Sequence, residues 1–210
     1  MDGLIAELRY SLQLTRRPFK GFWDLKHENY GSLRTALVIL GAAVVVFVAS
    51  DLLSDPLFSG VLGSQYYDVL LTILPLFLLY INWCIASWCL TCLFDGQGTF
   101  KDICIATAYA LVPLVIFTAI NIPLSWFFVE QERTFYNLIN FIGYFWSGLL
   151  LFCGTLVIHQ YSFTKTIAIC FFTILGMTLI IYLIVLFVVL IMQIFGVAEL
   201  FIAELSFRIF

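Results

Sequence analysis

The sequence predicts an all-α polytopic integral membrane protein, a bundle of five transmembrane helices preceded by a short N-terminal amphipathic helix. Of its 210 residues, 63% are hydrophobic and 11% are charged, whereas soluble domains average about 45–50% apolar and about 25% charged residues. A helix needs roughly 20 apolar residues to cross a hydrocarbon core of about 30 Å. Five apolar runs reach that length: 33–53, 69–94, 103–128, 135–158 and 166–194.

The chain therefore divides into an amphipathic or interfacial segment at 1–32, a membrane domain at 33–194 and an outer C-terminal segment at 195–210. At helical period, apolar residues of the first segment gather on one face. These residues are Leu4, Ile5, Leu8 and Leu12. The segment either lies on anionic lipid or packs against the protein's own cytoplasmic face. Residues 196–210 either prolong the fifth span or lie on the outer surface.

The basic residues predict the orientation. Six of the ten Lys and Arg residues lie within the first 34 positions. With the N-terminus in the cytoplasm, the inner segments hold eight basic residues and the outer segments two, which agrees with the positive-inside rule. We therefore expect a multi-pass cell-membrane protein with an extracytoplasmic C-terminus, whose first span acts as an uncleaved signal anchor. The asymmetry indicates orientation and does not indicate nucleic-acid binding.

The inner loop 95–102 is the most patterned stretch of the sequence. Its two glycines allow a tight turn, and Thr99 or Asp102 can cap the third span. The loop lacks the terminal Glu of a calcium site and the Gly-Lys-Ser/Thr end of a phosphate loop. It is therefore a structural turn or a docking site for a partner. The candidate partner-binding residues, here and in the N-terminal segment, are Asp95, Gly96, Gly98, Thr99, Phe100, Lys101, Asp102, Phe19, Phe22 and Trp23.

Polar residues inside the spans form a second group of candidates. Unpaired amides are costly in lipid, so we expect Asn82, Asn121, Asn140, His159, Gln160 and Gln193 to face other helices. Small residues four apart allow helix backbones to approach closely. The residues assigned to helix packing or to a polar stripe are Asn82, Ala106, Tyr109, Ala110, Pro113, Asn121, Asn140, Gly143, Ser147 and His159. Either helix packing or a substrate groove explains such a stripe.

No metal site, cofactor or catalytic centre is predicted. Cys84, Cys89 and Cys92 lack a second ligand pair and nearby histidines, so we expect all six cysteines to be small apolar residues of the helix interior. The central thirds of the spans contain no Asp or Glu. That absence disfavours an intramembrane aspartyl protease and proton-coupled transport. His159 is expected to be a hydrogen-bonded interfacial histidine.

The stretch 17–26, the loop 95–102 and the Tyr109-Ala110-Leu111-Val112-Pro113 segment together resemble prokaryotic members of the Yip family, the Ypt-interacting proteins. The resemblance covers nearly the whole chain and implies five spans and a cytoplasmic N-terminus. Eukaryotic members bind prenylated Rab-type GTPases and act in vesicle traffic, and they have a long cytoplasmic N-terminal region, whereas only about 30 residues precede the first span here. For this shorter chain, the resemblance implies an accessory role beside other membrane proteins.

We therefore expect a non-enzymatic membrane scaffold or accessory subunit that contacts the lipid bilayer and other integral membrane proteins, such as transporter subunits, or a second copy of itself. The alternative is a channel or carrier for a small or lipidic solute that depends on Asn121, Asn140 or His159. An intramembrane enzyme that uses His159 has the least support.

Overall fold

The computed structural model describes residues 2–28, 30–55 and 69–209, and within them it contains helices and no strand. Five helical segments are long and apolar enough to cross a membrane, which confirms the predicted fold class. The elements are α1 (Asp2–Arg16), α2 (Pro18–His27), α3 (Leu33–Leu53), α4 (Val69–Leu93), α5 (Phe100–Ala110), α6 (Val112–Ser125), the short 3₁₀ helix η1 (Glu130–Glu132), α7 (Arg133–His159) and α8 (Phe163–Ile209).

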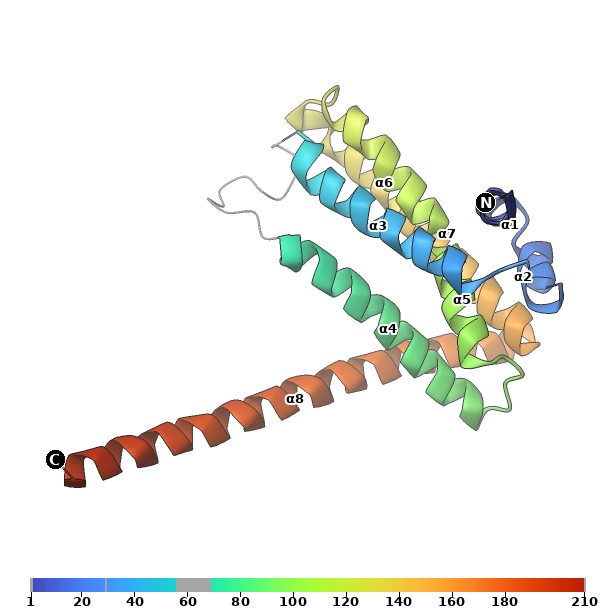
Figure 1. Ribbon diagram of the computed structural model, residues 1–210. Helices are drawn as coiled ribbons and strands as arrows, with labels where there is room; N and C mark the ends of the chain where they lie inside the picture. Colours follow the sequence, from blue (N-terminus) through green and yellow to red (C-terminus); the bar gives the residue numbers. More distant parts are fainter. Residues whose placement is uncertain (1, 29, 56–68, 210) are drawn as a thin grey trace.

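Helices α3, α6 and α7 run side by side, with α5 continuing α6 towards the end of the bundle where α1 and α2 lie (Figure 1). Helix α4 packs mainly on α8 and also contacts α5 and α3. The core is formed where α1, α2, α3, α5 and α7 meet, and it includes Leu14, Phe22, Ile39, Tyr109 and Leu150. The core therefore lies at the end of the bundle that α1 and α2 cover.

The N-terminal segment forms two helices that pack on the protein itself. On α1 the buried side chains are Ser11 and Leu14, whereas Leu12 is 51% exposed. Of the predicted apolar face, Leu8 packs against the core whereas Leu12 does not, and the burial of Leu4 and Ile5 lies outside what the structure describes. Helix α2, which periodicity did not predict, contributes Phe22 and Leu25 to the core. Tertiary contacts with α7 thus decide which side chains are buried.

A carboxylate on α1 holds the start of α3. Ser32 is the N-cap of α3 and accepts a hydrogen bond from the Thr35 amide. The hydroxyls of Ser32 and Thr35 both donate to Glu7. A negative charge near a helix N-terminus is favoured by the helix dipole. Glu7 therefore links α1 to the first membrane span, α3, through hydrogen bonds.

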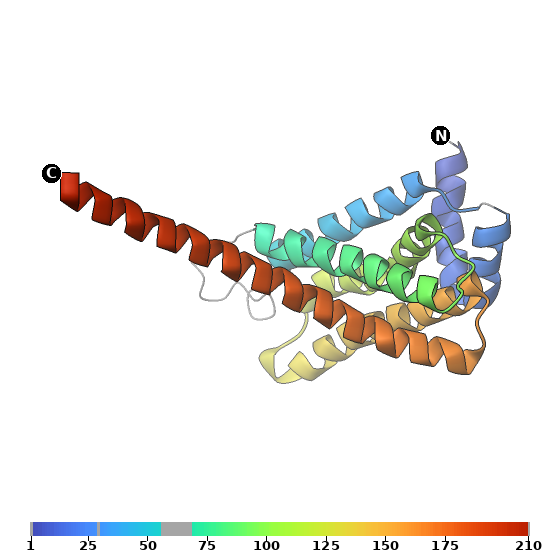
Figure 2. The same ribbon diagram turned by 90° about the horizontal axis from the view of Figure 1, so that it is seen from below.

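Helix α8 contains 47 residues and extends past the ends of α3 and α4 (Figure 2). Its first part packs against α4, where Thr173 is buried and Asn82 donates to the Met177 carbonyl at 3.2 Å. From 181 to 197, every residue is exposed. The C-terminal segment thus continues the fifth span as helix.

Candidate functional site

The inner loop leads into α5 through a capping box. Thr99 caps α5, its Oγ1 accepting the Asp102 amide at 3.3 Å, while Asp102 Oδ2 accepts the Thr99 amide at 3.0 Å. Asp95 takes a left-handed conformation with φ 55°, which Asp tolerates better than most residues. The loop therefore has the turn and capping geometry that its residues favour.

The glycines of this loop lie directly against the end of α7. A Cβ on Gly96 would lie 2.5 Å from His159 Nδ1 and from the Tyr161 hydroxyl. A Cβ on Gly98 would lie 2.6 Å from Ile158 Cγ2, and the Gly98 amide donates to His159 Nδ1 at 3.3 Å. We call this contact, between residues 94–99 and 158–161, the loop junction. Its close approach requires glycine at both positions.

Two lysines from other elements hold the carbonyl ends of helices at the loop junction. Lys26 of α2 donates to the Ile158 carbonyl at 2.6 Å, and Lys165 of α8 donates to the Phe94 carbonyl at 2.8 Å. Both carbonyls belong to C-terminal helix ends, where a cation is favoured by the helix dipole. The loop junction thereby connects α2, α4, α7 and α8.

His159 is 2% exposed, and its ring stacks on Tyr161 with centroids 5.4 Å apart. Because Nδ1 accepts from Gly98, the proton of the neutral imidazole resides on Nε2. Burial raises the pKa of the Tyr161 phenol, with Asp95 and Cys92 adding to the effect. His159 is thus a hydrogen-bonded packing residue of the loop junction.

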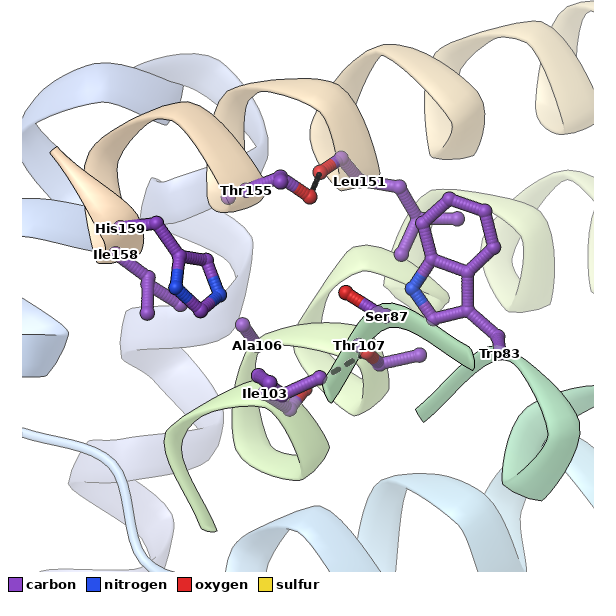
Figure 3. Close-up of a pocket in the computed structure, with 10 residues that line it drawn as sticks. Trp83, Ser87, Ile103, Ala106, Thr107, Leu151, Thr155, Ile158 and His159 are labelled. Carbon is purple, nitrogen blue, oxygen red and sulfur yellow. Dashed lines mark hydrogen bonds between the residues drawn. The ribbon is translucent and has the colours of Figure 1, made fainter. Parts of the chain in front are cut away.

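A small cavity lies beside His159 between α4, α5 and α7 (Figure 3). The hydroxyls of Thr107 and Thr155 donate within their own helices, to the carbonyls of Ile103 and Leu151. The cavity volume of about 10 Å³ corresponds to one water molecule. It can hold a water but not a solute of metabolite size.

The third span is broken at Leu111, between α5 and α6. Pro113 stands in the first turn of α6, where its missing N–H costs little. The Leu114 amide donates to Ser147 Oγ of α7 at 3.2 Å. Pro113 and Ser147 therefore both lie at this helix break.

Small residues let the helices around this break approach closely. A Cβ on Gly143 would lie 2.9 Å from Phe117 Cβ of α6. Ala106, Tyr109 and Ala110 of α5 are all buried in the core. These positions pack against neighbouring helices.

Replacing Ser147 with alanine will lower the free energy of unfolding by roughly 1 kcal/mol, because the Leu114 amide loses its side-chain acceptor. Reversible unfolding in mixed micelles measures the loss. The neighbouring Gly148→Ala variant is the control, since nothing lies within 4 Å of a Cβ at that position. An unchanged unfolding midpoint for Ser147→Ala would show that water or lipid replaces the hydroxyl.

The amides of the spans lie in separate helix contacts. Asn121 donates to the Tyr136 carbonyl at 3.3 Å between α6 and α7, while Asn82 joins α4 to α8. Asn140 is half-buried on α7. None of these three lines the cavity beside His159. The described part of the chain thus does not bring Asn121, Asn140 and His159 into one solute site.

Two polar residues lie where the sequence analysis did not expect them. Gln160 and Gln193 are both exposed, so the expectation that they face other helices is wrong. Gln160 caps α7 in a left-handed conformation with φ 53°, which places it in the turn after the span. Gln193 lies on the exposed part of α8.

The candidate partner-binding residues divide by exposure. Phe19, Trp23 and Phe100 are 58%, 48% and 44% exposed, and Asp95, Thr99 and Lys101 are also exposed. Phe22 is fully buried. It is therefore a core residue that a partner cannot contact, and its assignment to a partner surface is wrong.

The cysteines are all free, but they are not uniformly interior residues. Cys84 and Cys153 are buried, whereas Cys89 and Cys92 are exposed on α4, where lipid surrounds a membrane span. Within residues 2–28, 30–55 and 69–209, no group of three or more His, Cys, Asp or Glu side chains is arranged to hold a metal ion.

Comparison with known proteins gives a family. The family model described as "Yip1 domain" matches residues 12–187, a range that includes α2, the loop junction, the first four spans and the first part of the fifth. No curated protein and no solved structure matches the chain. Because the family model matches well over half of the sequence, the chain belongs to the Yip1 family.

Proposed function

We propose that this protein is a non-enzymatic membrane scaffold or accessory subunit that acts through helix–helix contacts with other integral membrane proteins. The observation that carries the proposal is the free part of α8, residues 181–197, exposed on every side. Each of the other spans has buried residues where it packs on its neighbours, whereas this segment has none within the described chain. A transporter subunit is one class of partner that such a helix suits.

The length of α8 supports a protein partner in addition to lipid. Its apolar part, Phe163–Val197, contains 35 residues, which span about 52 Å at 1.5 Å per residue. The hydrocarbon core is only about 30 Å thick, and transmembrane helices tilt by about 20° on average. A dozen or so apolar residues would therefore extend beyond the core unless another protein covers them.

Gln193 adds a polar group to the free part of α8. Side-chain amides on membrane helices hydrogen-bond across to neighbouring helices, with contributions of about 0.6 to 2 kcal/mol. No acceptor or donor for Gln193 exists within the described chain. A partner helix would supply one.

The proposed orientation places the N-terminus, the loop junction and the start of α8 on the cytoplasmic side of the cell membrane. Eight of the ten basic residues then lie on that side, as the positive-inside rule requires. The free part of α8 crosses to the opposite side, so the partner's contacting surface lies within and outside the membrane.

The test is a photo-crosslinker placed at each position from 181 to 197 in cells, with Leu37 and Val45 on the exposed face of α3 as controls. A packed partner helix gives crosslinks to one protein that recur every three or four residues. The controls give none to that protein. Crosslinks only to lipid along the whole of α8 would refute the proposal.

A further inference from the structure

A basic hollow lies between α1 and α2, which together form the N-terminal hairpin. Its volume is about 130 Å³, and Gln13, Arg17 and Lys20 line it. The floor is rigid, because the two helices cross closely: a Cβ on Gly21 would lie 2.8 Å from Leu14 Cγ. The hollow is thus formed by the close packing of α1 on α2.

The hydrogen bonds around the hollow leave its two cations available. The Tyr10 hydroxyl donates to the Gly21 carbonyl at 3.0 Å and to Asp24 Oδ2 at 3.3 Å, which engages the one carboxylate in the lining. Arg17 and Lys20 are exposed, and neither side chain has an ion-pair or hydrogen-bond partner within the described residues. With two cations and one carboxylate in its lining, the hollow carries a net positive charge.

Contacts with α7 place the hairpin beside the bundle. Trp146 Nε1 donates to the Thr15 carbonyl at 3.3 Å, and Lys26 donates to the Ile158 carbonyl at 2.6 Å. Both contacts fall in the second half of α7, which leads into the loop junction. The hairpin therefore lies at the same end of the bundle as the loop junction.

Arg17 lies two residues after Thr15, in the basic, aromatic segment that the charge pattern places at the cytoplasmic interface. Anionic headgroups attract exposed cations at such an interface. The anions present there are lipid phosphates, and basic pockets beside membrane helices bind anionic headgroups. Phe19 and Trp23 are exposed on α2, the helix that contributes Lys20 to the hollow, and tryptophan favours the membrane interface.

We propose that the hollow between α1 and α2 binds the phosphate of an anionic phospholipid in the leaflet on the N-terminal side of the membrane. Arg17 and Lys20 contact the phosphate oxygens, and Gln13 contacts the glycerol region. Phe19 and Trp23 lie against the acyl chains. The bound lipid holds the hairpin at a fixed depth beside α7.

The test titrates the purified full-length protein with phosphatidylglycerol and, separately, with phosphatidylcholine, and counts bound lipids by native mass spectrometry. The R17Q/K20Q variant removes the two cations of the hollow. The matched control R34Q/K101Q removes two exposed cations from the same end of the bundle but away from the hollow. Unfolding midpoints verify that both variants fold.

We expect R17Q/K20Q to bind phosphatidylglycerol roughly 30-fold more weakly, whereas R34Q/K101Q retains the affinity of the unchanged protein. Phosphatidylcholine binding is weak in all three. Equal losses in the two variants would show diffuse surface attraction and overturn the proposal. It is also overturned if inorganic phosphate in the millimolar range displaces the lipid from the unchanged protein, because the site would then recognise the free anion.

Discussion

Replacing Phe22 with alanine will lower the free energy of unfolding by roughly 3 kcal/mol or more and release the N-terminal hairpin from α7. The ring is completely buried and lies in the core cluster. Its edge carbons lie 3.2–3.5 Å from the Cβ position of Gly154 on α7. Since no other side chain can enter that narrow contact, truncation leaves a cavity.

Unfolding in mixed micelles measures the loss of stability, and limited proteolysis between residues 17 and 32 reports release of the hairpin. The matched control is Phe19→Ala on the same helix. Phe19 is 58% exposed, so we expect its removal to change stability by less than about 1 kcal/mol. If both variants lose the same stability and resist protease alike, α2 is not docked on α7 as the structure describes.

The spans were predictable because hydrocarbon imposes a length and forbids unsatisfied backbone groups. The capping box at Thr99 and Asp102 was equally predictable, since it depends on residues three apart in the sequence. Both features are local. The break at Leu111 was only partly predictable from the sequence. Pro113 indicates a helix start, but Ser147, which accepts the hydrogen bond from the Leu114 amide, lies on another helix.

Contacts between distant segments could not be predicted in the same way. Phe19 and Phe22 are both aromatic residues in a basic stretch, and only packing against α7 distinguishes the exposed one from the buried one. Gly98 and His159 are 61 residues apart. The charge pattern placed both on the same side of the membrane, but it did not indicate that they touch.

The exposed position of Gln193 shows a different limit of prediction from the sequence. The cost of an unpaired amide in lipid predicts that intramembrane amides face other helices, but it does not say whether those helices belong to the same chain. Asn82 and Asn121 donate to carbonyls of neighbouring helices of this chain. Gln193 is exposed and has no such neighbour within the described residues.

Replacing Gly98 with alanine will cost roughly 2–4 kcal/mol of unfolding free energy, since overpacking costs about 1–3 kcal/mol and a lost hydrogen bond about 1 kcal/mol. The new methyl group would lie 2.6 Å from Ile158 Cγ2 and 2.8 Å from His159 Cε1. Relieving that clash moves the loop away from α7 and breaks the bond from the Gly98 amide to His159. Unfolding in mixed micelles measures the cost.

A double-mutant cycle identifies the loop junction as the cause. Ile158→Ala removes the methyl group that Gly98→Ala meets first, so the double variant should lose less stability than the sum of the two single losses. Gly148→Ala, in open space on α7, should lose none. Strictly additive losses would mean that the contact with Ile158 is not the cause, and the close approach of the loop to α7 would no longer explain the glycine.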